Sequence, residues 1–325
     1  MPNAVEKFLA HAAYEPVVVA ETVANTTLDE LVAVIRERND CILFGPPGTS
    51  KTYMIDHLAE RLGADVALKK IVQFHAGYSY EEFVEGIVPD VSKGGFKYQS
   101  GAFLDFCQQA AAQPEEKLCL FIIDEINRAN ITAVFGEVMN LMDEKGTREI
   151  ITPKQKIPFS IPKNVVIIGT MNTADKSLAK LDFALRRRFR FLPVYPSATN
   201  LHTMISANGF DPSIPFTVDE YITCFNVLNS KIAKHSLLGK ELMLGHVLWT
   251  RRNKSTAPYN AADICAIFRE CIFPQLENYC GSNRDVLASL LGTHLKDKLI
   301  YGYSILDSDV LDFLTGLKNS QVVNS

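Results

Sequence analysis

The sequence lacks the features of a membrane, secreted or zinc-binding protein. None of its apolar runs approaches the roughly 20 residues of a membrane span. Residues 1–14 have no apolar core after a basic start, so we expect no signal peptide. The seven cysteines form no Cys-x-x-Cys pair and no zinc spacing with histidine. We therefore predict a soluble, cytoplasmic protein with no membrane partner, whose cysteines are reduced and mostly structural.

An excess of one charge is also lacking. Lysine and arginine number 33 against 37 aspartates and glutamates, which gives a net charge of −4 and no bulk electrostatic argument for direct nucleic-acid binding. The content of 47% hydrophobic and 22% charged residues is ordinary for a globular protein. A length of 325 residues is long for one core, and about two domains are expected.

Short apolar runs alternate with helical patterns up to residue 196. Strands are predicted at 41–44, 69–75, 118–123, 165–169 and 189–194, and helices at 51–62, 102–112 and 131–144. Uninterrupted apolar strands alternating with helices indicate an α/β fold, in which helices cover both faces of a parallel sheet. Segments rich in glycine or proline predict two inserted hairpins, near 86–101 and within 146–163.

Helical patterns dominate the rest of the chain. They cover residues 217–233, 261–277 and 284–299, and two further helices are predicted before residue 39, the second at 27–38. We therefore predict a helical lead-in at 1–38, an α/β core at 39–196 and a mainly helical domain at 197–325.

A glycine-rich loop directly follows the first strand and precedes a helix. Its residues are Gly45, Pro46, Pro47, Gly48, Thr49, Ser50, Lys51 and Thr52. In this context, backbone N–H groups can wrap the β- and γ-phosphates of a nucleotide, Lys51 adds positive charge, and the Thr52 hydroxyl can bind Mg²⁺. Ser50 replaces the usual glycine and could alter turnover. The alternative is an ordinary Gly-Pro turn before a helix.

Polar residues follow the next two core strands. Asp124 and Glu125 come after the strand at 118–123, and Asn172 ends the following strand. Because parallel strands bring their carboxyl ends to the first loop, Asp124 can hold the Mg²⁺ hydration shell and Glu125 can orient or deprotonate the attacking water. Asn172 could bridge this water and the γ-phosphate. The alternatives are an acidic helix cap and an asparagine bonding its own turn.

Two further groups have more evenly balanced interpretations. Asp175 is favoured as the cap of a short helix at 176–181 over a nucleotide contact. Arg187 and Arg188 could stabilise γ-phosphate charge in a neighbouring subunit, although sequence physics alone favours a salt-bridged basic helix end. Arg128 could orient the acidic pair or reach the adjacent subunit.

Several long motifs, in this order, resemble the McrB family, which supplies the NTPase subunit of modification-dependent restriction systems. They are QFHAGYSYEEF at 73–83, IDEINRAN at 123–130, FGEVM at 135–139, MNTADKSL at 171–178 and ALRRRF at 184–189. The resemblance is strong over residues 40–195 and weak over 235–250. Wider relatives are MoxR-type and dynein-related AAA+ proteins, which share a hairpin inserted in the second helix.

The resemblance implies an AAA+ P-loop NTPase with a C-terminal helical lid. It implies a homo-oligomeric, hexameric ring with Mg²⁺ and nucleotide at subunit interfaces. It also implies a McrC-like endonuclease partner that enters the ring centre, which the hairpin near 86–101 would face. In that family Asn172 to Asp175 form a shared motif, and the arginine finger falls within 186–188.

Three expectations depart from the family or stay open. GTP is the substrate of the best-known McrB members, but no Asn-Lys-x-Asp guanine signature occurs, so GTP and ATP are both retained. About 38 residues precede the core, too few for a DNA-reading module, so DNA is expected to be reached through a partner. Met243 stands where an arginine can occur. Lys240 and His246 are possible substitutes, and His246 is favoured as structural.

Three functions are compatible with these residues. The first is an NTPase that drives a nuclease in restriction of foreign modified DNA. The alternatives are a MoxR-like ATP-dependent remodeller of protein complexes and a scaffold that binds nucleotide without turnover. Glu125 argues against the scaffold, which needs no water-activating carboxylate.

Overall fold

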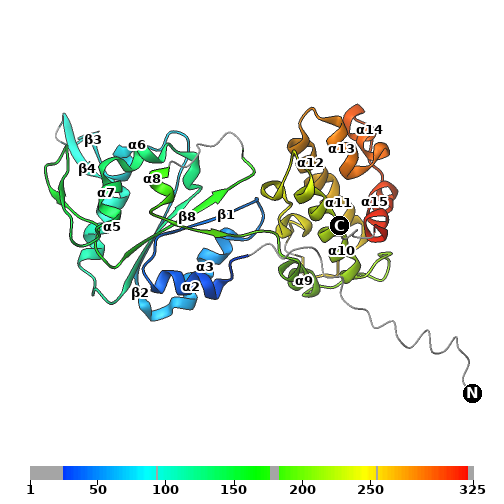
Figure 1. Ribbon diagram of the computed structural model, residues 1–325, viewed down its shortest axis with the longest axis horizontal. Helices are drawn as coiled ribbons and strands as arrows, with labels where there is room; N and C mark the ends of the chain where they lie inside the picture. Colours follow the sequence, from blue (N-terminus) through cyan, green and yellow to red (C-terminus); the bar gives the residue numbers. More distant parts are fainter. Residues whose placement is uncertain (1–24, 93, 176–182, 254, 321–325) are drawn as a thin grey trace, which may run out of the picture.

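The computed structural model describes residues 25–92, 94–175, 183–253 and 255–320. Figure 1 shows a part built around a sheet and, beside it, a part made of helices. We call them the sheet part and the helical part. The predicted helix before residue 25 and the one at 176–181 lie outside the described residues.

The central sheet has five parallel strands in the order β2-β5-β8-β1-β9. The strands are β1 Cys41–Gly45, β2 Val66–Gln73, β5 Leu118–Asp124, β8 Val165–Asn172 and β9 Arg190–Pro193. All five were predicted. Strand β1 pairs with β8 and β9, and β5 pairs with β2 and β8, so the carboxyl ends of β1, β5 and β8 lie side by side at one edge.

Alternate residues of each strand enter different cores, which explains the continuous apolar runs. Ile42 and Phe121 belong to one core, whereas Cys41, Leu43 and Ile122 belong to the other. Helices α2 Leu28–Arg36 and α3 Lys51–Leu62 cover the second core. Helices α4 Tyr80–Phe83, α5 Ala102–Ala111, α6 Ile131–Phe135, α7 Met139–Met142 and α8 Phe183–Arg186 lie on the first. The predicted arrangement of helices on both faces is confirmed (Figure 1).

The single helix predicted at 131–144 is wrong. A 3-10 turn, Gly136–Val138, separates α6 from α7, because Gly136 has a φ of +50° and so leaves the α-helical region. The Tyr80 ring packs against this glycine, and its hydroxyl donates to Glu137 Oε1 over 2.6 Å. Tertiary packing therefore fixes the break.

Both predicted hairpins are confirmed. Strand β3 Glu85–Pro89 pairs antiparallel with β4 Phe96–Ser100, and β6 Ile150–Ile151 pairs with β7 Pro158–Phe159. The two strands of the first hairpin expose three large apolar side chains, Ile87, Phe96 and Tyr98, and its turn exposes Val91.

The helical part has its own hydrophobic core, with buried residues from Leu201 to Leu317. Its helices are α9 Ala198–Ser206, α10 Val218–Lys234, α11 Ala261–Ile267, α12 Phe273–Cys280, α13 Arg284–Leu291, α14 Thr293–Tyr301 and α15 Asp307–Asn319. The helix predicted at 261–277 contains a π-helical segment, Phe268–Ile272, and the one predicted at 284–299 is divided at Gly292. The seven cysteines are free and buried, and no described helix has the length and apolarity to cross a membrane.

Candidate nucleotide-binding site

The glycine-rich loop lies between β1 and α3, as predicted. The Lys51 ammonium folds back onto this loop and donates to the carbonyl oxygens of Gly45 over 2.9 Å and Pro46 over 2.7 Å. Burial lowers the pKa of Lys51 to about 8, although the nearby Glu125 and Asp124 carboxylates act in the opposite direction. Lys51 is thus a buried cation, and a bound polyphosphate would stabilise its charged form.

A threonine that the motif analysis missed holds the acidic pair. Thr170 Oγ1 donates to Asp124 Oδ1 over 2.5 Å and accepts the Glu125 backbone N–H over 3.0 Å. Glu125 has left-handed backbone angles, φ 54° and ψ 45°, a conformation that costs about 1–3 kcal/mol and persists where surrounding contacts enforce it. Thr170 lies two residues before Asn172 on β8, so strand alternation was the signal that could have identified it.

Asn172 and Arg128 orient the Glu125 carboxylate. Asn172 Nδ2 donates to Glu125 Oε1 over 2.5 Å, and Arg128 Nε lies 3.4 Å from Oε2. Oε2 is buried and, apart from this ion pair, accepts no hydrogen bond from the residues that the structure describes. Asn127, a second residue that the sequence did not single out, donates to the Asn172 carbonyl over 3.2 Å. One carboxylate oxygen is therefore fixed while the other keeps the acceptor capacity that a general base requires.

Residues from the loop and two strand ends surround one cavity of about 270 Å³. Those lining it are Pro47, Gly48, Thr49, Ser50, Lys51, Thr52, Tyr53, Asp124, Glu125, Thr170, Asn172 and Val247. The structure thus brings together Lys51, Thr52, Asp124, Glu125 and Asn172. The oxygen donors of Thr52 and Asp124 fit Mg²⁺, which usually takes one or two carboxylates together with waters and substrate phosphates. Among the described residues, no cluster of three or more His, Cys, Asp or Glu is suited to hold a metal ion.

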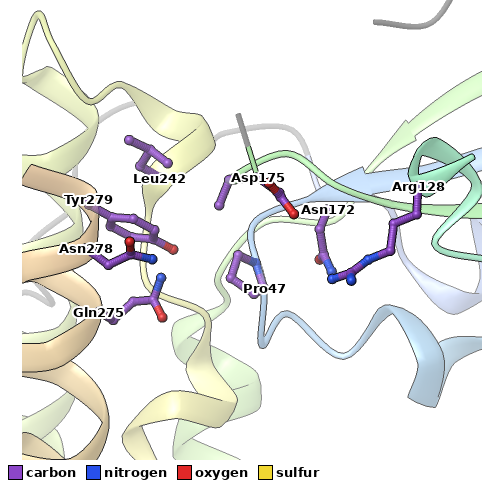
Figure 2. Close-up of a pocket in the computed structure, with 9 residues that line it drawn as sticks. Pro47, Arg128, Asn172, Asp175, Leu242, Gln275, Asn278 and Tyr279 are labelled. Carbon is purple, nitrogen blue, oxygen red and sulfur yellow. The ribbon is translucent and has the colours of Figure 1, made fainter. Parts of the chain in front are cut away.

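A second cavity, of about 460 Å³, adjoins the first at Pro47 and Asn172. Figure 2 shows Gln275, Asn278 and Tyr279 of α12 facing Pro47 across it. Asp175 lines this second cavity and not the phosphate-sized one. The helix that Asp175 was expected to cap lies outside the described residues.

The two candidate arginines lie in different environments. The Arg188 side chain is 4% exposed, and its Nε and Nη2 donate to Asp143 Oδ2 over 3.0 and 2.6 Å. The Arg187 side chain is 68% exposed, with Nη2 3.8 Å from the same carboxylate. Arg188 is therefore held within its own chain, whereas Arg187 is open to a neighbour.

The weakly matching segment around residue 243 contacts the loop through His246. His246 Nε2 lies 2.8 Å from Ser50 Oγ, and burial lowers the pKa of His246 to about 4. Met243 is buried, and the Lys240 ammonium lies 5.4 Å from the centre of the Tyr195 ring. Of the possible substitutes for a lid arginine, His246 is the one in contact with the loop.

Comparisons with known proteins agree with this geometry. Residues 40–189 match the AAA domain of the dynein-related subfamily. The type IV methyl-directed restriction enzyme EcoKMcrB subunit of Escherichia coli (strain K12) is 40% identical over 235 residues, 69% of this chain and 50% of that protein. Component YdiS of the type II restriction enzyme BsuMI of Bacillus subtilis (strain 168) is 28% identical over 190 residues, 46% of this chain and 55% of that protein.

The chain spans about half the length of these curated relatives. The crystal structure of an ATPase from Cytophaga hutchinsonii ATCC 33406 aligns over 88% of this chain and 78% of its own, with 15% identity and a TM-score of 0.39.

Proposed function

Because residues 40–189 form an AAA domain of the dynein-related subfamily, in a chain related to McrB restriction subunits, we propose that this protein binds and hydrolyses a nucleoside triphosphate. One observation carries the proposal. Lys51, Thr52, Asp124, Glu125 and Asn172 line a single cavity, in which Glu125 is oriented by a 2.5 Å hydrogen bond. We also propose 39–196 as the AAA+ core and 197–325 as its helical lid.

Each lining residue has a role in this proposal. Loop N–H groups and Lys51 bind the phosphates. Thr52 and Asp124 would hold Mg²⁺, which supplies positive charge to the phosphate oxygens when bound. Glu125 orients the attacking water and accepts its proton, while Asn172 fixes the carboxylate. Exposed Arg187, rather than Arg188, reaches the γ-phosphate of a neighbouring copy. Asp175, which lines the second cavity together with Asn172, acts at that cavity.

The substrate is GTP or ATP. The described residues that line the phosphate-sized cavity would face the phosphate end of the nucleotide, so they do not distinguish the two bases. Hydrolysis assays with each nucleotide in turn decide between them, since the specificity constant kcat/KM measures the preference directly.

The test of hydrolysis is Glu125→Gln, which keeps the side-chain shape and removes the base. We expect nucleotide binding to persist and turnover to fall about 10²–10⁴-fold, the usual contribution of a positioned general base. Exposed Glu116, outside both cavities, provides the matched control Glu116→Gln, which is expected to turn over normally. Turnover near the wild-type rate in Glu125→Gln would refute the assignment.

The assembly we propose is a hexameric ring that drives or regulates a McrC-like endonuclease in restriction of foreign modified DNA. DNA is reached through a partner. Two relatives bear the names of restriction-enzyme components, which supports this over a MoxR-like remodeller. The exposed Ile87, Phe96 and Tyr98 of the inserted hairpin suit docking of such a partner. The mass of the nucleotide-bound Glu125→Gln protein tests the ring. The rate of nucleotide hydrolysis, measured with and without a nuclease encoded by a neighbouring gene, tests whether hydrolysis is coupled to that nuclease.

A further inference from the structure

The helical part touches the phosphate-binding loop through the short segment 245–248. The backbone N–H of Val247 donates to the Gly48 carbonyl over 3.0 Å, and the Leu248 side chain lies against Gly48. A Cβ atom at Gly245 would overlap the backbone of Gly48 and the Pro47 carbonyl oxygen. The two backbones therefore meet in direct contact, at the loop that receives the phosphates.

Ser50 adds a side-chain link to this contact. Its backbone is left-handed, with φ 66° and ψ 26°, which costs a residue with a side chain about 1–2 kcal/mol and costs glycine almost nothing. Its side chain does not cap α3. The hydroxyl instead lies 2.8 Å from His246 Nε2. The serine is thus strained in the position where glycine is usual, and its hydroxyl serves a contact with the helical part.

His246 is held in one orientation and one tautomer. It is 1% exposed, and its Nδ1 accepts the backbone N–H of Ser197 over 3.3 Å. The neutral ring therefore carries its proton on Nε2, which donates to Ser50 Oγ. Ser197 is the N-cap of α9, the first helix of the helical part. One imidazole thus joins the phosphate-binding loop, the segment 245–248 and the start of the helical part.

The same segment leads directly into the core of the helical part. Trp249, the single tryptophan of the chain, is 0% exposed. Its ring meets those of Tyr221, Phe225 and Phe268 edge to face, and its carbonyl accepts the Tyr221 hydroxyl over 3.1 Å. Because close-packed cores transmit strain, displacement of His246 would change the packing around the Trp249 ring.

We propose that the Ser50–His246 hydrogen bond couples phosphate binding in the loop to the position of the helical part, with His246 as a positioning residue for hydrolysis. This coupling rests on the proposed nucleotide binding. It adds the contact through which binding in the loop would affect the helical part. Phosphates bound by the N–H groups of residues 48–52 fix the Ser50 backbone, and its hydroxyl then fixes His246. A loop with glycine at position 50 would still bind phosphate, but it would lack the hydrogen bond to His246. Phosphate binding would then have less effect on the position of the helical part.

The experiment follows Trp249 fluorescence while a non-hydrolysable GTP or ATP analogue and Mg²⁺ are added, with affinity measured separately by calorimetry. In the wild type, binding is expected to change the fluorescence. Ser50→Gly is expected to bind with affinity within about two-fold, to lose most of the fluorescence change, and to hydrolyse about five-fold more slowly, the effect of one neutral hydrogen bond.

Two amide variants of His246 separate coupling from folding. Glutamine places an N–H near the position of Nε2 and is expected to retain most of the fluorescence change and of the rate. Asparagine places its amide near Nδ1, cannot reach Ser50, and is expected to behave like Ser50→Gly. Thermal unfolding of each variant shows which are folded, and Ser50→Gly has the residue usual for this loop.

The outcomes are distinguishable. Absence of wild-type binding in calorimetry would remove the proposed function itself. Binding without a wild-type fluorescence change, or Ser50→Gly with wild-type fluorescence and rate, would overturn the coupling alone. Equal behaviour of the glutamine and asparagine variants would do the same.

Discussion

The amide of Asn172, the last residue of β8, and the carboxylate of Glu125, the residue directly after the adjacent strand β5, are joined by a 2.5 Å hydrogen bond. This contact fixes one carboxylate oxygen, and Thr170 fixes the backbone of the same glutamate. Both tethers come from the same face of β8. The orientation of Glu125 is therefore set by β8 as much as by its own strand.

Removing this tether should slow hydrolysis more than it weakens binding. We expect Asn172→Ala to lower kcat by about 10–100-fold and to change KM by less than about three-fold, because a misplaced base affects the reacting geometry more than substrate affinity. Steady-state phosphate release measures both constants. A kcat within two-fold of the wild type would show that Glu125 does not depend on Asn172.

Nucleotide affinity should depend on pH through Lys51. With its pKa lowered to about 8, the free protein loses this proton as the pH rises above 8. A polyanion binds the charged form, so binding must then take up a proton. The dissociation constant is expected to be flat from pH 7 to 8 and to rise above pH 8, by up to ten-fold per pH unit. Calorimetry at several pH values measures it.

Two controls isolate the lysine. Lys51→Arg stays charged throughout, so its affinity, whatever its magnitude, should lose the pH dependence. The free energy of unfolding of the nucleotide-free protein should instead rise between about pH 8 and 10.5. In this range the unfolded chain keeps the Lys51 proton and the folded protein has lost it, so a higher pH favours the folded state. Affinity that stays constant up to pH 9.5 in the wild type would contradict the prediction.

The arginine cluster yields opposite expectations for neighbouring residues. Arg188→Ala removes a mostly buried partner of Asp143 and should lower the free energy of unfolding by about 1–2 kcal/mol. Exposed Arg187→Ala should leave stability unchanged and reduce hydrolysis by about 10³-fold or more, as loss of an arginine finger does. Chemical denaturation and hydrolysis assays measure the two effects.

Mixing variants tests whether the site is shared. Arg187→Ala subunits combined with Lys51→Ala subunits can form interfaces that contain one intact loop and one intact arginine, so some activity should return. No recovery at any mixing ratio, with mixed assembly verified by mass, would show that Arg187 does not act on a neighbour.

The sequence was enough to predict most of the residues around the phosphate-sized cavity, because parallel strands necessarily bring their carboxyl ends together, but it missed Tyr53, Thr170 and Val247. Lys51, Asp124, Glu125 and Asn172 follow from that rule and from the loop motif. What it could not predict depends on contacts between distant residues. The Arg188–Asp143 pair spans 45 positions and the Ser50–His246 bond 196. Neither has a local pattern.

The divided helices have the same explanation. Residues 131–144 have continuous helical spacing, and Gly136 within them was compatible with a helix at modest cost. The helix is broken at Gly136 because Tyr80, from another helix, packs against this glycine and donates a hydrogen bond to Glu137. Likewise, the left-handed backbone of Glu125 is maintained by Thr170, which no pattern around residue 125 indicates.

Close contact between the two backbones at Gly245 and Gly48 leads to a prediction with a control in the same chain. Gly245→Ala places a methyl group into the Gly48 backbone, so the helical part must shift away from the loop. We expect a loss of about 1–3 kcal/mol in unfolding free energy, typical of overpacking, with weaker nucleotide binding. Gly316→Ala, in open space within α15, should instead stabilise the protein by up to about 1 kcal/mol. Thermal unfolding measures both changes, and an unchanged midpoint for Gly245→Ala would mean that the loop and segment 245–248 can separate freely.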